Sequence, residues 1–192
     1  QETWSTSGQG SGSSCVTKTG AEAFYGYNYP FGSSANTGYE KKEVSLGYFV
    51  TTSADETFFV LTLDAPGNKD GGTVTIKFDS PDLKNTPAGV VMMDDGGEGR
   101  PGWTASTGKG EFSWGWAPCC TDGMVFGPLP DKNYCFNFIV SGFTGLEGFT
   151  IGGFNDKTKT VETIPLSIAD VQKGVSVCGL TCTDFCSQKS SC

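Results

Sequence analysis

The residues best suited to chemistry lie in one stretch, residues 111–129, which reads E-F-S-W-G-W-A-P-C-C-T-D-G-M-V-F-G-P-L. Two tryptophans, Trp114 and Trp116, precede the adjacent cysteines Cys119 and Cys120. Adjacent cysteines either form a vicinal ring that can act as a redox switch, or bond to separate partners and fix a corner of the chain. We favour separate partners, because no histidine or arginine lies nearby in the sequence to stabilise a reactive thiolate.

Oxygen ligands for a metal ion gather in one acidic turn. Asp94, Asp95 and Glu98 lie close together among glycines, and Asp122 follows the cysteine pair. Carboxylates in flexible loops are the ligands that Ca²⁺ takes, although the spacing is not that of an EF-hand loop. We therefore expect either a solvated turn, which we favour, or a calcium site that stabilises the fold.

Flat aromatic side chains could form a platform for sugar rings. The residues concerned are Trp103, Trp114 and Trp116, with Tyr25, Tyr27 and Tyr29 on one face of an expected strand. The alternative is that these rings fill the core or a contact between subunits. A carbohydrate is therefore a candidate ligand, with the three tryptophans as its binding residues.

The composition argues against several classes of function. The chain has no histidine, which excludes Ser-His-Asp and Cys-His catalysis and any histidine metal centre. Its net charge is −8 and its lysines are spread along the chain, so a nucleic-acid partner is not expected. No pair of carboxylates is singled out for glycoside hydrolysis. We expect no catalytic residues, no enzyme activity and no cofactor other than Ca²⁺.

Cysteine usage predicts the compartment. The chain has eight cysteines in 192 residues, and an even number without histidine favours disulfides in an oxidising environment over zinc. We expect a secreted, extracellular protein without a membrane span, since no apolar run approaches the length of a bilayer and Gln1 suits a processed secretory chain. The expected disulfide cysteines are Cys15, Cys119, Cys120, Cys135, Cys178, Cys182, Cys186 and Cys192. The simplest pairing would join the first four to the last four, but the sequence does not choose among the many pairings.

The middle of the chain has the pattern of an all-β domain. Short apolar or alternating runs are separated by Gly, Pro, Asn and Asp, which indicates an antiparallel β-sandwich of a jelly-roll-like kind. The expected strands cover residues 23–29, 44–52, 57–63, 73–78, 89–93, 111–116, 124–126, 134–140, 149–153 and 161–168.

The two ends differ from this domain. Residues 1–20 form a Ser/Thr/Gly-rich N-terminal arm, which either packs on its own domain or lies on a neighbouring molecule. Residues 21–170 form the sandwich, and residues 171–192 form a Cys-rich C-terminal tail pinned by disulfides. In that tail Cys178, Cys182 and Cys186 are spaced to share one helical face.

Two functions fit these features. The first is a non-enzymatic structural or adhesive protein, a repeating subunit of an extracellular filament or matrix that binds other copies of itself through its terminal segments. The second is a Ca²⁺-dependent carbohydrate-binding module. Burial of the tryptophans and the contacts of the N-terminal arm distinguish the two.

Overall fold

The structure is a computed structural model that describes residues 20–28, 31–52, 54–93, 102–130, 134–155 and 160–178. Strands make up most of it, and the two α-helices are short. The elements are α1 Gly20–Tyr25, β1 Val44–Thr51, β2 Thr57–Leu63, β3 Gly72–Asp79, the 3₁₀ helix η1 Pro81–Leu83, β4 Gly89–Met93, β5 Gly102–Thr104, β6 Lys109–Trp116, β7 Asp122–Leu129, β8 Cys135–Thr144, β9 Gly148–Asn155, β10 Thr160–Leu166, α2 Ile168–Lys173 and β11 Val175–Cys178.

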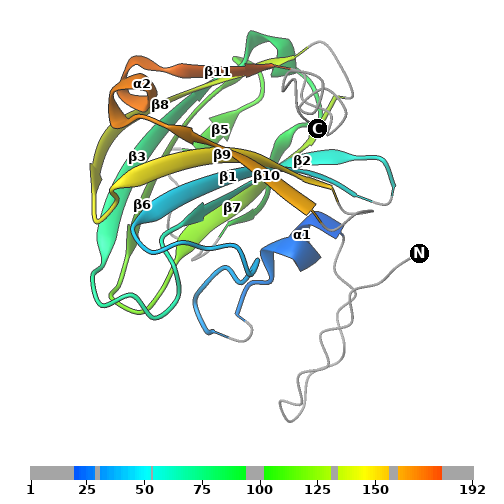
Figure 1. Cartoon of the computed structure of the whole chain (residues 1–192). Coiled ribbons are helices and arrows are strands. Elements are labelled where there is room, and N and C mark those ends of the chain that lie inside the picture. The colour runs from blue at the N-terminus through cyan, green and yellow to red at the C-terminus, as the bar shows by residue number, and fades with distance from the viewer. Residues whose placement is uncertain are drawn as a thin grey trace.

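The strands form two sheets that pack face to face (Figure 1). Sheet A has the order β10-β9-β1-β2-β7-β4, and sheet B has the order β11-β8-β3-β6-β5. Aromatic rings join the sheets in the core, where Phe59 of sheet A lies 5.3 Å from Phe136 of sheet B between ring centroids. The predicted two-sheet, β-rich architecture is confirmed. One described pair, β1 with β9, is parallel instead of antiparallel, because the chain crosses from β8 in sheet B to place β9 beside β1.

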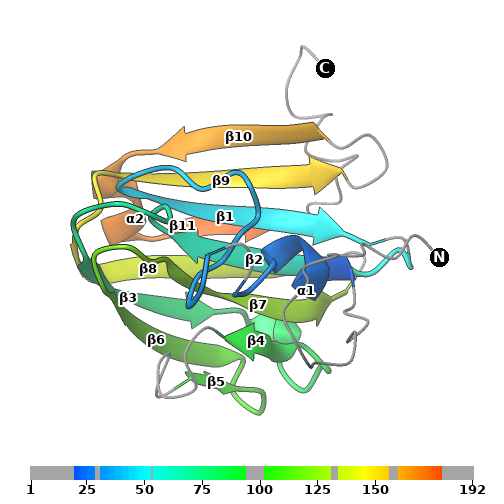
Figure 2. The same ribbon diagram turned by 90° about the horizontal axis from the view of Figure 1, so that it is seen from below.

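Burial along the strands follows the layers. In β3, Val74, Ile76 and Phe78 are buried while Thr73 and Lys77 are exposed, as expected for a strand with one face in the core and one in solvent. All of β2 is buried, because sheet A is covered on both faces. Its inner face packs on sheet B, and its outer face packs on the N-terminal part of the described chain (Figure 2).

The predicted strand over residues 23–29 is wrong. The chain forms the helix α1 there, which lies over β2 and β7 on the outer face of sheet A (Figure 2). The alternating tyrosines suggested a strand, but Ala21 and Tyr25 are four residues apart and point to the same helical face, where both are fully buried. Tyr27 follows the helix in a turn, and Tyr29 lies outside the described residues.

Other differences occur at the ends of elements. β7 extends from Asp122 to Leu129, beyond the expected residues 124–126, and β5, α2 and β11 were not expected. Ser167 starts α2 by accepting a hydrogen bond from the backbone N–H of Asp170 at 3.1 Å. β11 pairs with β8, so sheet B continues past residue 170, and Cys178 ends a strand instead of joining a helix. Of the expected arm, residues 1–20, only Gly20 is described, at the start of α1, and residues 179–192 also lie outside the described part of the chain.

Within the described residues, neither α-helix has the length and apolar character required to cross a membrane.

Candidate functional site

The tryptophans predicted to bind sugars lie inside the protein. Trp114 and Trp116 are 3% and 5% exposed and belong to the core between the sheets, on the inner face of β6. Trp103 is half-buried and packs its ring edge against Phe126, with 4.9 Å between ring centroids. For Trp114 and Trp116 the structure fits the alternative that these rings fill the core, because alternation along β6 places both rings on the core side.

The two adjacent cysteines are bonded to each other. Cys119 and Cys120 form a vicinal disulfide in the loop between β6 and β7, so the expectation of separate partners is wrong. Cys119 is exposed and has a φ of 137°, in the region that residues other than glycine rarely adopt. The sequence could not distinguish these pairings, because spacing alone allows both.

A second disulfide involves Cys135 at the start of β8. In the backbone register of β8 and β11, Cys135 lies directly opposite Cys178. The pairings of Cys15, Cys182, Cys186 and Cys192 remain predictions, since those residues are not described.

The loop that carries the vicinal disulfide is fastened to the N-terminal cover of sheet A. Thr121 accepts a hydrogen bond from the backbone N–H of Ala35 at 2.8 Å, and its own N–H donates to the hydroxyl of Ser34 at 3.1 Å. All three residues are fully buried. This corner therefore joins segments that are far apart in the sequence.

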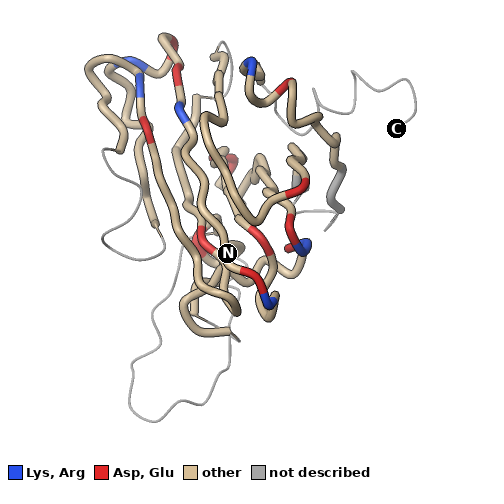
Figure 3. The backbone as a smooth tube through the Cα atoms, turned by 90° about the vertical axis from the view of Figure 1, so that its left-hand side faces the viewer, with Lys and Arg blue, Asp and Glu red and all other residues tan. Residues whose placement is uncertain are grey.

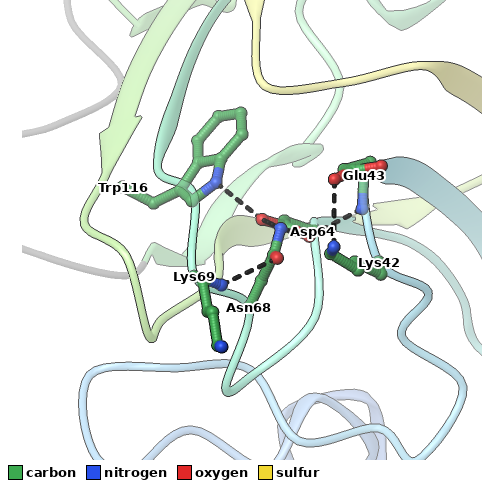
Figure 4. A network of polar contacts seen from close by, with 6 residues as sticks. All are labelled: Lys42, Glu43, Asp64, Asn68, Lys69 and Trp116. Carbon is green, nitrogen blue, oxygen red and sulfur yellow. Dashed lines mark hydrogen bonds and ion pairs between the residues drawn. The ribbon is translucent and has the colours of Figure 1, made fainter.

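Asp64 is the centre of a buried polar network beside the same corner (Figure 4). Its carboxylate accepts hydrogen bonds from the backbone N–H of Glu43 at 2.7 Å and from the indole N–H of Trp116 at 3.1 Å. The side-chain amide of Asn68 donates to both carboxylate oxygens, at 3.0 and 2.8 Å. A buried carboxylate is tolerated when such donors replace its water.

This network is suited to structure rather than to catalysis. Asp64 is fully enclosed, and both its oxygens are already occupied by donors from three parts of the chain. The turn that follows is tied to the disulfide loop, because Gly67 donates its backbone N–H to the carbonyl of Cys119 at 2.6 Å. Lys42 forms an ion pair with Glu43 at 3.3 Å at the edge of the network. The sequence indicated only a turn here. An Asp at the end of an apolar strand with an Asn four residues later was the available signal.

The predicted calcium ligands are mostly outside the described structure. Asp94, Asp95 and Glu98 belong to undescribed residues 94–101, and Asp122 is buried at the start of β7. Among the residues that the structure describes, no three acidic, Cys or His side chains come together as a metal site. The calcium site remains a prediction.

A groove of about 410 Å³ crosses the outer face of sheet B. Two ion pairs between directly opposite residues line it, Lys77 with Glu111 at 3.4 Å and Lys109 with Asp79 at 3.3 Å. Figure 3 shows that positive and negative residues of the described chain lie near one another along the backbone. The groove therefore offers hydrogen-bond donors and acceptors but little net charge.

Comparison with protein-family models, with curated proteins and with solved structures finds no match for this chain.

Proposed function

We propose that this chain is a secreted, non-enzymatic structural or adhesive protein, a repeating subunit of an extracellular filament or matrix that assembles through its terminal segments. One observation carries the proposal: β4, an edge strand of sheet A, exposes large apolar side chains. These are Val90 and Val91, which are 37% and 42% exposed. Free sheet edges accept strands from other molecules, and apolar edges favour this pairing.

The buried polar groups support the same proposal, because they make contacts within the fold. The Asp64 network and the contacts of Thr121 connect parts of one chain, and Trp114 and Trp116 fill the core. The disulfides of Cys119 with Cys120 and of Cys135 suit an oxidising, extracellular environment.

The proposal also includes a jelly-roll-like path of the chain, a fastened C-terminal tail and an N-terminal arm. The chain passes repeatedly between sheets A and B after β2, which is compatible with a jelly-roll-like path. The disulfide of Cys135, opposite Cys178 in the strand register, supports a C-terminal tail fastened to the sandwich. Residues 1–19, which precede α1, serve as the N-terminal arm.

The test is negative-stain imaging of the purified full chain, with and without reductant. The proposal expects filaments or sheets of repeated subunits in the non-reduced sample. A field of separate single particles at every protein concentration contradicts it.

A carbohydrate-binding module is the second candidate, supported by the groove on sheet B. The hydroxyls of Thr104 and Thr107, the amide of Asn137 and the two ion pairs provide groups that bind sugar hydroxyls. A glycan array in the presence and absence of a calcium chelator tests it. Binding lost on Glu111→Ala supports the groove as the site, and no binding to any glycan rejects this candidate.

A further inference from the structure

Strand β4 is the least protected edge of the two described sheets. Residues Gly89–Met93 bond to β7 on one side, and no described strand pairs with the other side. The strand contains no charged residue and no proline. In an antiparallel pair, alternate residues point their N–H and C=O groups away from the neighbour, so the free edge of β4 presents backbone donors and acceptors.

The other edges carry features that hinder strand addition. β10 contains Glu162 and Pro165, and proline cannot donate a backbone hydrogen bond. β5 and β11 are only three and four residues long. On β4, a bulge falls between Val90 and Met92. The strand is nevertheless anchored, because Met92 packs on the buried cluster on the outer face of sheet A and Met93 packs on the core between the sheets.

Building on the proposed function, we propose that the free edge of β4 is the acceptor for the N-terminal segment, residues 1–19, of a second copy of this chain. From Thr3 to Thr17 this segment contains no charge and no proline. Every peptide group there can therefore donate to the edge, and no charge has to be desolvated against it. Trp4, near the start of this uncharged run, supplies apolar surface for Val90 and Val91.

The segment is also long enough to reach a second copy. Nineteen extended residues span about 60 Å. The described chain begins at Gly20, which lies close to Thr52 at the end of β1. A Cβ atom added to Gly20 would be 3.0 Å from the Thr52 side chain. The segment therefore leaves the fold beside sheet A, the sheet that carries β4. By contrast, Asp184 and Lys189 divide residues 179–192 into short uncharged runs, none as long as the run from Thr3 to Thr17.

Strand addition between copies has a defined consequence for assembly. The donor segment and the acceptor edge are different surfaces of the same chain, so each copy can donate to one neighbour and accept from another. Such a head-to-tail contact produces an open chain of subunits unless its rotation closes a ring.

Two full-length variants separate the donor from the acceptor. Val91→Lys places a charge on the acceptor edge at an exposed position, where the fold tolerates it. Thr6→Pro with Ser7→Pro removes backbone donors on both sides of the arm, whichever way the arm lies on the edge. Ile164→Lys on β10 is the matched control, because Ile164 is 41% exposed and Val91 is 42% exposed.

Sedimentation velocity measures assembly of each chain and of mixtures. We expect Val91→Lys and the double proline variant each to raise the concentration needed for assembly about tenfold or more, while Ile164→Lys assembles like the wild type. An equal mixture of the two defective variants should form heterodimers, since one retains a donor and the other an acceptor. Circular dichroism checks that all variants are folded.

The remaining outcomes overturn the inference in distinguishable ways. If the wild type assembles and Val91→Lys assembles equally well, β4 is not the acceptor, while the proposed function stands. If Val91→Lys blocks assembly but the double proline variant assembles like the wild type, residues 1–19 are not the occupant of the β4 edge. Another segment, or the β4 edge of a second copy, then pairs with it. If the mixture stays monomeric, the arm does not act between copies. If the wild type never assembles, the proposed function itself fails.

Discussion

The indole N–H of Trp116 donates a hydrogen bond of 3.1 Å to the buried carboxylate of Asp64. This contact connects the end of β6 in sheet B to the residue that follows β2 in sheet A. Since Asp64 also binds Glu43 and Asn68, one carboxylate holds together one end of the sandwich.

Replacing Asp64 should therefore destabilise the fold strongly. Asp64→Ala leaves the N–H groups of Trp116, Glu43 and Asn68 buried without an acceptor, and we expect the free energy of unfolding to fall by about 3 kcal/mol. Urea unfolding measures it. Asp70→Ala, at an exposed position in the following loop, should change it by less than about 0.5 kcal/mol. Equal effects of the two changes would contradict the role of the network.

Trp114 should contribute through packing and not through ligand binding. Its ring stacks on Phe112 with 5.6 Å between centroids and is 3% exposed. We expect Trp114→Ala to lower the free energy of unfolding by about 3 to 5 kcal/mol through the cavity left behind. In a variant with Trp4→Phe and Trp103→Phe, only Trp114 and Trp116 emit, and we expect weak quenching of their fluorescence by acrylamide because both rings are buried. Strong quenching at Trp114 would show a surface ring instead.

The vicinal disulfide should contribute little to stability. A disulfide stabilises mainly by closing a loop in the unfolded chain, and the loop between adjacent residues is minimal. We expect Cys119→Ser with Cys120→Ser to lower the free energy of unfolding by less than about 1 kcal/mol. Mass spectrometry of non-reduced proteolytic peptides should find the two cysteines linked within one peptide. A loss of several kcal/mol, or cross-linked peptides from distant segments, would show that each cysteine fastens a separate part of the chain.

Alkaline pH should weaken the fold through two buried tyrosines. Burial raises the pKa of Tyr48, with a further increase from the charge of Glu40, and burial alone raises the pKa of Tyr134. Both phenols therefore keep their protons in the folded chain, while the unfolded chain releases them above a pH of about 10. The stability that these groups contribute is present below that pH and is lost as pH rises beyond it.

Urea midpoints between pH 8 and 11 measure this loss. Tyr134→Phe is the informative variant, because the Tyr134 hydroxyl is buried without a hydrogen-bond partner among the described residues. We expect this change to leave stability at neutral pH unchanged or slightly higher and to reduce the alkaline fall. An alkaline fall of the same size in the variant would exclude Tyr134 as a cause.

The sequence predicted the features that depend on local pattern. The alternation of Val74, Ile76 and Phe78 located β3, and turn residues separated most of the other strands. Where a local pattern fitted two structures, the prediction was wrong: tyrosines at every second position suggested a strand where Ala21 and Tyr25 form the buried face of a helix. The Asp64 contact with Trp116 joins residues 52 apart, and no local pattern reports such a contact.

The same limit applies to the site. Trp114 and Trp116 were correctly placed on one face of a strand, but which face meets the core depends on the opposing sheet. The exposure of Val90 and Val91 follows from the position of β4 at the end of sheet A, which strand order alone determines.

The central claim is that this chain assembles with copies of itself. Sedimentation velocity of the full, non-reduced chain over a wide range of concentrations tests it most directly. The account predicts sedimentation coefficients that increase with concentration without reaching a limiting small oligomer. A single species with the sedimentation coefficient of a monomer at every concentration would contradict it.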